Sequence, residues 1–279
     1  MKDLESLRET LLKEYHRDTT KAVRVDLSLV YSFLNDTKRL LTLDYLNPDF
    51  TTEMMDDLLA KIKTKLELIL AQSDVKAEES QAKTDSFLND LPNLKQLLSG
   101  TIEAILNGDP AAQSREEIVT CYPGFAAILN YRIAHSLYGL GLLFVSRVVT
   151  EEAHRSTGID INPGATIGKN FFIDHGTGIV IGETALIGDN VKLYQGVTLG
   201  ARSLSKGRML VGMKRHPTIG NNVTIYSSAS ILGGDTVIGD NTTVGANVYI
   251  TSSVPKDSIV YLGNSGIRVI DKVTAPQTK

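Results

Sequence analysis

The sequence predicts an α + β protein in which an all-helical N-terminal half precedes a parallel β-helix. Two observations lead to this prediction. Apolar residues recur at helical spacing up to about residue 155, and from Ile161 onward they recur every six residues with glycines in step. Because a unit of one short strand and one turn cannot bury its apolar side chain alone, such repeats must stack into a solenoid.

The bulk composition excludes several classes of protein. The 279 residues are 42% apolar and 22% charged with a net charge of −3, so no basic excess points to nucleic acid as a partner. Cys121 is the only cysteine, which excludes an internal disulfide and fits a reducing compartment. No apolar run approaches the ~18 residues of a membrane span, and the charged N-terminal stretch lacks a signal-peptide core. We therefore expect a cytoplasmic protein that does not bind membranes.

The first helices are predicted from stripes of apolar residues. The stripes comprise Leu4, Leu7 and Leu11; Val23, Leu27, Val30 and Leu34; and Leu58, Ile62, Leu66 and Ile69. The polar stretch 71–84 is predicted as a loop or a loosely packed helix end, and residues 87–107 as a helix that stops at Gly108. Asp109-Pro110 is then expected to start another helix.

Two further predictions complete the helical half. Ser114 followed by Glu117 has the pattern of a capping box for a short helix. The stretch from Pro123 to about Arg155 is apolar and rich in small residues. We expect it to form one or two helices that are buried against other helices or a neighbouring subunit.

The second half is predicted from a ladder of apolar residues with one interruption. The ladder comprises Ile161, Ile167, Ile173, Ile179, Ala185, Val191 and Val197, and after a break Ile219, Ile225, Leu232, Ile238, Val244 and Ile250. Residues 201–215 break the beat and carry five basic residues and no acid. We therefore divide the chain into a helical domain at 1–155, a β-helix domain at 156–262 with an inserted loop at 201–215, and a C-terminal tail at 263–279.

Asp174-His175 is the most conspicuous candidate for chemistry in the repeat, because β-helix coils consist mostly of small and aliphatic residues. An imidazole with an ordinary pKa of ~6.5 can accept a proton at neutral pH, and a carboxylate that fixes its tautomer improves it as a base. Asp160 lies fifteen residues earlier, near one triangular turn of ~18 residues, and coils stack ~4.8 Å apart. Asp160 is thus a candidate partner. From composition alone, a hydrogen bond from His175 to a turn is the slightly favoured alternative.

Other charged residues are weaker candidates on their own. Arg215 could hold a substrate carboxylate through a two-pronged hydrogen bond, and Lys206 and Arg208 could meet phosphates. Asp109 could bind an ammonium group. For the three cations, an ordinary solvated loop charge is the favoured reading, and for Asp109 helix capping is sufficient.

The order of several motifs resembles that of a known family. The motifs are Asp-Pro-Ala at 109–111, Tyr-Arg-Ile-Ala-His at 131–135, Asp-Ile-Asn-Pro-Gly-Ala-Thr-Ile-Gly at 160–168, Asp-His-Gly-Thr-Gly-Ile-Val-Ile-Gly-Glu-Thr-Ala at 174–185, Gln-Gly-Val-Thr-Leu-Gly at 195–200 and Arg-His-Pro at 215–217. Together they resemble serine O-acetyltransferase over about residues 109–255. The six-residue beat alone indicates only acyltransferases in general.

The resemblance implies a fold, an assembly and a reaction. The fold is a helical domain followed by a left-handed parallel β-helix of hexapeptide repeats. Members form trimers, often paired into hexamers, with the active site between the β-helices of neighbouring subunits. The reaction transfers the acetyl group of acetyl-CoA to L-serine, which is the first step of cysteine biosynthesis, without a metal ion.

The resemblance also implies roles for individual residues. His175 would be the general base that takes the serine hydroxyl proton, and Asp160 would orient it. The implied substrate-binding residues are Asp109, Pro110 and Asp174 for the ammonium group and Arg215 and His216 for the carboxylate. The implied CoA-binding residues are Gly200, Ala201 and Ser227. We further hypothesise that the loop at 201–215 closes its positive charge over the CoA phosphates.

The end of the chain departs from the family. The family's tail ends in Ile and docks into O-acetylserine sulfhydrylase, whereas this chain ends Ala-Pro-Gln-Thr-Lys. We therefore do not carry over that docking, or the cysteine feedback that uses the same tail.

Three alternative functions stay open on the sequence. The first is a hexapeptide acetyltransferase for a sugar or another small acceptor. The second is a zinc protein like γ-carbonic anhydrase, although only His175 and His216 lie in the repeat and a three-histidine site needs one more ligand. The third is a structural trimer without activity.

Overall fold

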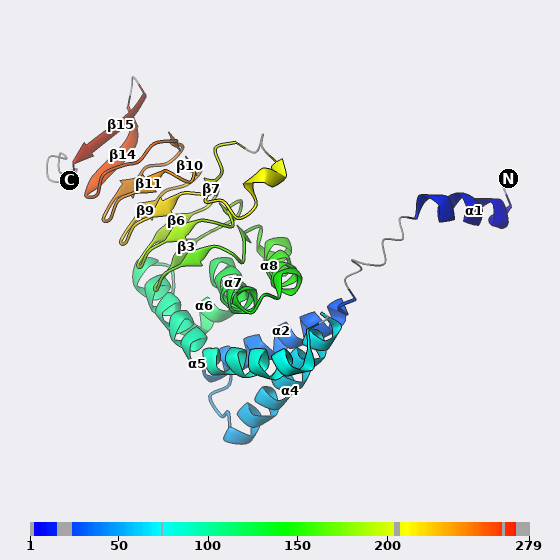
Figure 1. The fold of residues 1–279 in the computed structure, drawn as a ribbon. Helices are drawn as coiled ribbons and strands as arrows, with labels where there is room; N and C mark the ends of the chain where they lie inside the picture. The colour runs from blue at the N-terminus through cyan, green and yellow to red at the C-terminus, as the bar shows by residue number, and fades with distance from the viewer. Residues whose placement is uncertain (1–2, 16–23, 74, 204–206, 264–265, 272–279) are drawn as a thin grey trace.

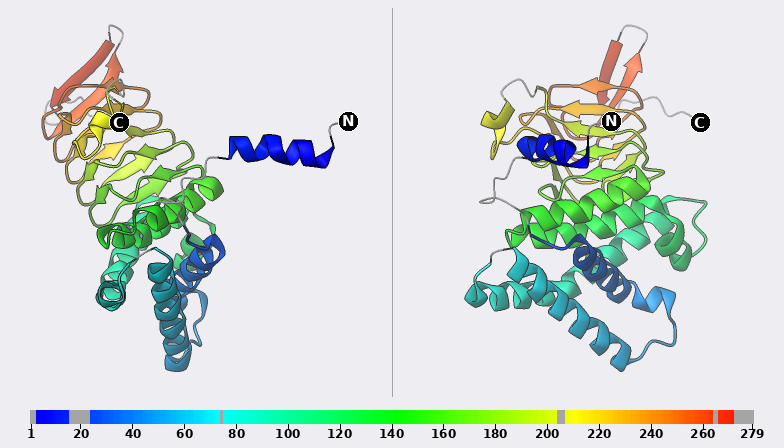
Figure 2. Two further views of the ribbon diagram at one scale, coloured as in Figure 1. Left: turned by 45° about the vertical axis from the view of Figure 1, so that its right-hand side comes forward. Right: turned by 90° about the vertical axis from the view of Figure 1, so that its right-hand side faces the viewer.

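The computed structural model describes residues 3–15, 24–73, 75–203, 207–263 and 266–271. Helices make up the first half of the chain, and a stack of short parallel strands stands on them (Figure 1). Two further views show that the first helix lies apart from both halves (Figure 2). The predicted α + β architecture is therefore confirmed.

The helices of the described residues follow the predicted apolar stripes. They are α1 (Leu4–Glu14), α2 (Leu27–Leu41), α3 (Leu43–Leu46), α4 (Thr52–Gln72), α5 (Ala77–Gly108), α6 (Arg115–Cys121), α7 (Pro123–Gly139) and α8 (Leu143–Thr157). In α4, Ile62, Leu66 and Ile69 are fully buried, as the stripe predicts. The Ser114 hydroxyl accepts from the backbone N–H of Glu117 at 3.1 Å, which confirms the predicted cap of α6.

Two helix boundaries differ from the prediction. Helix α5 begins at Ala77, ten residues before the predicted start at 87, because Thr84 and Phe87 already pack into the core. No helix starts at Asp109-Pro110. Asp109 is instead the C-cap of α5, and its side chain accepts from the N–H of Ala111 at 2.9 Å in a turn. The Asx turn thus takes the place of the expected helix start.

Helix α7 joins the helical half to the β-helix. The Tyr131 hydroxyl donates to the carbonyl of Ala165 at 2.6 Å, and the Arg132 guanidinium donates to the carbonyls of Ile167, at 2.5 Å, and Gly168. Tyr131 and Arg132 are almost fully buried. Because buried polar groups are costly unless paired, these bonds fix the first coil on α7.

The strands form three sheets, parallel except for the β14–β15 pair, that close a triangular solenoid. The sheet orders are β1-β4-β7-β10-β13, β2-β5-β8-β11 and β3-β6-β9-β12-β14-β15. The strands are β1 (Asp160–Ile161), β2 (Thr166–Ile167), β3 (Phe172–Asp174), β4 (Val180–Ile181), β5 (Leu186–Ile187), β6 (Lys192–Tyr194), β7 (Thr198–Gly200), β8 (Thr218–Ile219), β9 (Thr224–Ile225), β10 (Ser230–Leu232), β11 (Val237–Ile238), β12 (Thr243–Val244), β13 (Tyr249–Ile250), β14 (Ser258–Gly263) and β15 (Gly266–Asp271). The predicted stack of six-residue units is confirmed.

The first coil is two residues longer than the second. Asp160 pairs with Val180, and Val180 pairs with Thr198, so the coils take 20 (180 − 160) and 18 (198 − 180) residues. The extra residues lie between β3 and β4, where the step from Phe172 to Val180 is eight instead of six. The predicted ladder placed Ile179 above Ile161. In the structure Ile181 is the strand partner of Ile161, so the spacing of six does not continue across the longer turn.

One edge of the solenoid carries a column of asparagines in the left-handed region. Asn170, Asn190 and Asn222 have φ of 54°, 57° and 56°, and each side-chain amide donates to the next side chain up the stack. Asparagine tolerates this backbone region better than most residues. The column thus fixes the same tight turn in successive coils.

The last part of the chain differs from the predicted tail. Residues 266–271 form β15, which pairs antiparallel with β14 and extends the third sheet. The tail predicted at 263–279 therefore contains a strand, and residues 272–279 lie outside the described residues. Within the described part of the chain, no helix has both the length and the apolar character to span a bilayer.

Candidate active site

Two edges of the triangular solenoid carry the predicted site residues. The His175 edge, defined by residues 174–179, 195–197 and 226–229, leads from the sheet of β3 to that of β4. The Arg215 edge, defined by residues 182–185 and 201–217, leads from the sheet of β4 to that of β5. Each edge therefore holds a different part of the predicted site.

The two extra residues of the first coil place His175 on the outside of the solenoid. His175 has a φ of 59°, which is uncommon for a residue other than glycine, and its side chain is 72% exposed. Its Nε2 lies 3.8 Å from Oδ1 of Asp174. The imidazole is thus accessible to a small acceptor and adjoins a carboxylate.

A second carboxylate reaches this edge from the helical half. Oδ2 of Asp109 accepts from the Tyr122 hydroxyl at 2.8 Å, and Oδ1 accepts from the N–H of Ala111. This backbone hydrogen bond, together with the Tyr122 hydroxyl and the nearby positive charge of Lys192, holds the pKa of Asp109 below its ordinary value. Burial and the bond to Asp109 raise the pKa of Tyr122 to about 12. Asp109 is therefore ionised and Tyr122 neutral near pH 7.

Lys192 is the cation of this cluster. Its Nζ lies 3.4 Å from Oδ2 of Asp174 and donates to the carbonyl of Gly108 at 2.9 Å. The amine also lies over the rings of Phe172, at 4.3 Å, and Tyr194, at 4.7 Å. Since Asp109 and Asp174 together carry two negative charges and Lys192 carries one positive charge, the cluster has an excess of one negative charge when His175 is neutral.

Asp160 is near the same edge but has a different partner. Its Oδ1 lies 3.8 Å from Nη1 of Arg147 on α8, and Arg147 also forms an ion pair with Glu151. The bend at Gly176 packs against Ile159, next to Asp160 in the chain, so the loop that carries His175 passes close to Asp160. The predicted contact between the carboxylate of Asp160 and the His175 ring stays a prediction.

Asp160 also belongs to a group of possible metal ligands. Ligand atoms of Glu151, His154 and Asp160 lie within 4.8 Å of one another. The Arg147 guanidinium contacts both carboxylates of this group. Because the Arg147 guanidinium already pairs with both carboxylates, we interpret the group as an ion-pair network.

Arg215 and His216 lie on the other edge. The Arg215 guanidinium forms an ion pair with Glu183, whose carboxylate also accepts from the Tyr138 hydroxyl at 3.4 Å. The backbone N–H groups of Arg215 and His216 both donate to the Thr184 hydroxyl, at 2.9 and 3.1 Å. The end of the inserted loop is thus tied to the turn that contains Glu183 and Thr184.

His216 is buried at this turn rather than open to solvent. Its Nδ1 accepts from the N–H of Thr184 at 3.0 Å, and only 7% of the residue is exposed. Burial, with help from the positive charges of Arg215 and Lys214, lowers the pKa of His216 to about 4. The neutral ring therefore carries its proton on Nε2, which lies beside Gly182, where even a Cβ would not fit.

The predicted CoA-binding residues also divide between the two edges. Ala201 lines a cavity of about 380 Å³ on the Arg215 edge together with Arg202, Ser203, Leu210, Arg215, Gly233, Gly234 and Asp235. Gly200 directly precedes it at the end of β7. Ser227 lies on the His175 edge. Lys206, one of the cations assigned to the phosphates, lies outside the described residues, whereas Arg208 lies in the short 3₁₀ helix η2 (Gly207–Leu210).

Sequence reasoning missed Tyr122 and Lys192. Tyr122 follows α6 and Lys192 begins β6, and neither belongs to a recognised motif. Only the packing of α5 against α6 and β3, with the hydrogen bond from Lys192 to Gly108, brings them to Asp109 and Asp174. The one feature of the sequence that could have identified Lys192 is its charge at an outward strand position of the repeat.

The comparisons with known proteins agree with this geometry. The model of the bacterial transferase hexapeptide (six repeats) matches residues 216–252. A plasmid-encoded serine acetyltransferase of Synechococcus elongatus is 51% identical over 158 residues, which are 56% of this chain and 50% of that protein. The serine acetyltransferase of Helicobacter pylori is 48% identical over 132 residues, 47% of this chain and 74% of that protein. This chain belongs to the serine acetyltransferase family.

Solved structures of the family share the whole fold. Serine acetyltransferase 1 of Entamoeba histolytica, crystallised with L-cysteine, has a TM-score of 0.75 and 35% identity over 91% of this chain and 95% of its own. A Neisseria gonorrhoeae serine acetyltransferase in complex with serine has a TM-score of 0.59 and 27% identity, over 85% of this chain and 95% of its own. The helical half, which the curated relatives match only in part, is therefore also a family feature.

Proposed function

We propose that this chain transfers the acetyl group of acetyl-CoA to the hydroxyl of L-serine, which gives O-acetyl-L-serine and CoA in the first step of cysteine biosynthesis. The observation that supports this function best is an exposed His175 beside the carboxylates of Asp174 and Asp109 in a hexapeptide β-helix of this family. We also expect the protein to work in the cytoplasm, without a metal ion.

The reaction needs a base and a direct attack. His175 takes the proton of the serine hydroxyl while its oxygen forms a bond to the thioester carbonyl carbon of acetyl-CoA. The tetrahedral intermediate then breaks its carbon–sulfur bond, and the imidazolium returns the proton to the CoA thiolate. In this scheme Asp160 orients His175, which requires the carboxylate to turn from Arg147 toward the ring.

The excess negative charge on the His175 edge suits an ammonium group. Asp109 and Asp174 can hold it, because Lys192 neutralises only one of the two carboxylates. Pro110, next to Asp109, lies exposed in the adjoining turn. An acceptor without an amine would leave this charge unpaired, which favours an amino acid over a simple sugar.

The carboxylate of serine needs donors that carboxylates do not already occupy, and the one cation of the His175 edge, Lys192, pairs with Asp174. Arg215 and His216 lie on the other edge of the same solenoid, and the sheet of β1, β4 and β7 separates the two edges. We therefore propose that a neighbouring copy supplies Arg215 and His216, so that the active enzyme is a homotrimer or a dimer of trimers. In such a trimer, Gly200 and Ala201 of one copy also face Ser227 of the next along a shared CoA groove.

An acceptor competition tests the proposed function. The purified protein is given acetyl-CoA with free L-serine, L-homoserine or an amino sugar in parallel, and CoA release is measured. We expect serine to give the largest kcat/KM. Its ammonium and carboxylate groups would fix the α-carbon, and the one-carbon side chain then sets the distance from the hydroxyl to His175, which an extra methylene in homoserine changes. Preference for the amino sugar would contradict the assignment, and equal rates for serine and homoserine would contradict its specificity.

A further inference from the structure

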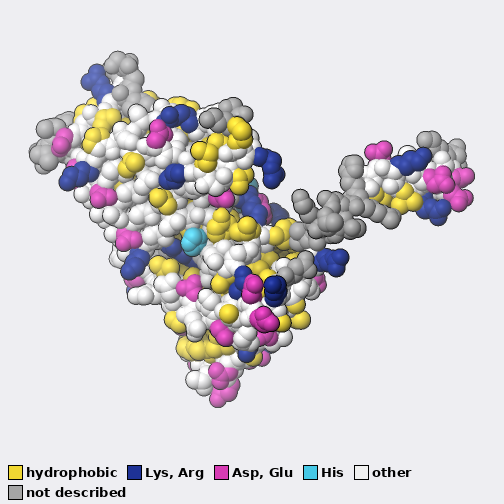
Figure 3. Space-filling view, in the orientation of Figure 1, with side chains coloured by type: hydrophobic (Ala, Val, Ile, Leu, Met, Phe, Trp, Pro, Cys, Tyr) yellow, Lys and Arg dark blue, Asp and Glu magenta, His cyan; other side chains and the backbone are white. Residues whose placement is uncertain are grey.

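Helix α1 is amphipathic, and its apolar side is uncovered. Leu4, Leu7 and Leu11 lie on one side of the helix and are 85%, 46% and 45% exposed. Figure 3 shows hydrophobic side chains along this helix with charged side chains around them, and no residue of α1 is buried. A helix of 11 residues is short for independent stability in water, where isolated helices below about 12–15 residues are marginal. The helix therefore requires an apolar surface to cover this side.

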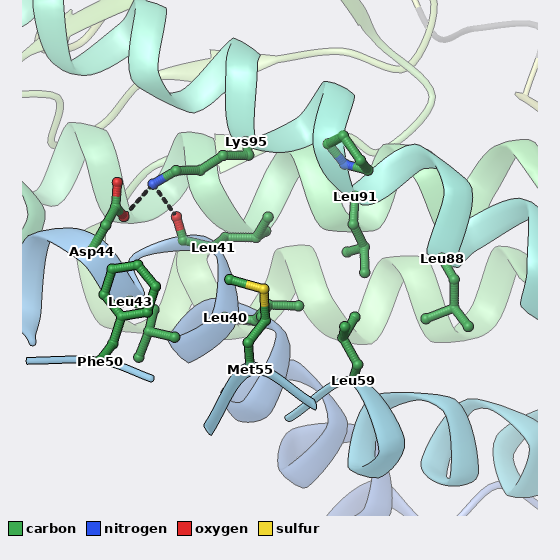
Figure 4. A pocket seen from close by; sticks show the side chains of 11 residues that line it. Leu40, Leu41, Leu43, Asp44, Phe50, Met55, Leu59, Leu88, Leu91 and Lys95 are labelled. Atoms are coloured by element: carbon green, nitrogen blue, oxygen red, sulfur yellow. Dashed lines mark hydrogen bonds and ion pairs between the residues drawn. The ribbon is translucent and has the colours of Figure 1, made fainter. Parts of the chain in front are cut away.

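The helical domain contains a groove of matching character. It has a volume of about 440 Å³ and lies between the C-terminal end of α2, the start of α4 and the middle of α5. Its lining, shown in Figure 4, consists of Leu40, Leu41, Leu43, Asp44, Phe50, Met55, Leu59, Leu88, Leu91, Pro92 and Lys95. The two charged residues, Asp44 and Lys95, form an ion pair with each other. The groove thus presents apolar side chains and no unpaired charge.

The covalent connection is long enough to bring α1 to this groove. The groove lies at the C-terminal end of α2, and α2 is 15 residues long, or about 21 Å. Its N-terminal end is fixed, because the N–H of Asp26 donates to the side chain of Gln72 at the end of α4. The 11 residues 15–25 can span at most about 36–40 Å. This length is sufficient to extend from the start of α2 back to the groove.

We propose that α1 docks through Leu4, Leu7 and Leu11 into the Leu40–Met55–Leu91 groove of its own chain. A tether of this length gives α1 an effective concentration in the millimolar range at its own groove. Docking removes the apolar sides of both partners from water, which is favourable by about 25 cal/mol per Å² of apolar surface. It also supplies the tertiary contacts that stabilise a short helix.

A single tryptophan tests the docking. The chain has no Trp, so a Leu7→Trp variant of the full chain carries one reporter, and Leu11→Trp serves as a second. We expect either tryptophan to emit at a shorter wavelength than free tryptophan in the same buffer. This blue shift should persist when the protein is diluted about a hundredfold. Emission at the wavelength of free tryptophan in both variants would overturn the proposal.

Groove variants identify the docking surface. Met55→Glu places a charge in the groove at a residue that is 37% exposed, and we expect it to abolish the blue shift. Leu68→Glu is the matched control, because Leu68 is 50% exposed on the same helix but does not line the groove. Circular dichroism checks that both variants fold, and Phe50→Glu replaces Met55→Glu if that variant does not. Loss of the shift in Leu68→Glu, or its persistence in the groove variants, would contradict the assigned surface.

A mixing experiment distinguishes the chain's own groove from that of a second copy. A chain that carries both Leu7→Trp and Met55→Glu is co-expressed with an excess of the native chain, which has no tryptophan and an intact groove. If α1 docks in its own chain, the emission stays that of an exposed tryptophan. Recovery of the blue shift would show that α1 docks into a neighbouring copy and would overturn the proposal.

Discussion

His175 shows how local backbone geometry can create a reactive position. Each six-residue unit buries one apolar side chain, so polar residues are left for the outward strand positions and the turns. Two extra residues between Phe172 and Val180 give the chain a loop with positive φ, which lifts the imidazole out of the stack. The ring is then free to approach a substrate, because none of the coil's own hydrogen bonds depends on its side chain.

His175→Ala tests the base directly. We expect kcat for serine acetylation to fall by ~10²–10⁴, the usual contribution of a general base. Because the side chain is 72% exposed, the thermal unfolding midpoint should change little. The measurement is steady-state kinetics together with a melting curve, and near-normal turnover in a folded variant would exclude His175 as the base.

The lowered pKa of His216 predicts that the free energy of unfolding depends on pH. Its pKa is about 4 in the folded protein and ~6.5 in an unfolded chain, so between these values the unfolded state binds a proton that the folded state does not. Stability should therefore be fully present above pH 6.5 and should be lost as the pH falls toward 4, by at most about 1.4 kcal/mol per pH unit.

The measurement for His216 is the free energy of unfolding at several pH values and one fixed protein concentration. In His216→Gln the pH slope should be smaller than in the native chain, because the titrating group is gone. The variant should also be less stable at pH 7, since the amide cannot reproduce the contact to Thr184. An unchanged slope would mean that the ring is not held neutral by its surroundings.

At the scale of elements, the coil edges carry structural and functional residues side by side. The asparagine column and the His175 loop both use positive φ, but the column does so in a repeated turn with paired side chains. The inserted loop is a third kind of turn. From Thr198 to Thr218 the chain advances 20 residues, whereas an ordinary repeat unit has six. Turns of a β-helix can thus be extended without disturbing the strands, which is how the fold accommodates a site.

Substitutions in the asparagine column test this view. Asn190 accepts from Asn170 at 2.8 Å and donates to Asn222 at 2.9 Å with a φ of 57°. Asn190→Gly should cost about 1 kcal/mol for the lost hydrogen bonds. Asn190→Ala should cost about 1–2 kcal/mol more, because alanine is strained in the left-handed region. Denaturant unfolding of both variants gives the comparison, and an alanine variant at least as stable as the glycine variant would refute the argument.

At the scale of the whole molecule, the residues of the proposed site lie on two separate edges of one chain. The His175 edge has two carboxylates, Lys192 and the proposed base, and the Arg215 edge has the Arg215 guanidinium and the cavity beside Ala201. A rigid triangular prism cannot bring two of its own edges together. We therefore propose that assembly with other copies completes the site.

Complementation between two inactive variants tests the shared site. His175→Ala and Arg215→Ala chains are refolded or expressed together, and serine acetylation is compared with each variant alone. In random trimers, on the order of a quarter of the sites combine a native His175 with a native Arg215 from the neighbour. We expect about that share of native activity. Activity no greater than the sum of the separate variants would place the whole site within one chain.

Some features of the protein follow from sequence alone because they depend on local spacing. The six-residue beat determined the solenoid, the stripes determined most helices, and the Asp174-His175 dipeptide in a turn marked the candidate base. The start of α5 was missed because polar residues at 77–86 carry little periodicity, although a long helix supports them through packing at Thr84 and Phe87.

Only the tertiary structure decided how these parts meet. The coil length placed His175 outside the stack, α5 and α6 brought Asp109 and Tyr122 to Lys192 and Asp174, and the prism shape separated Arg215 from His175. These relations join residues far apart in the sequence, so no local pattern contains them. The physical reason is that a periodic sequence specifies the repeating unit, whereas the number of residues in each turn and the packing of helices on the first coil set which side chains share an edge.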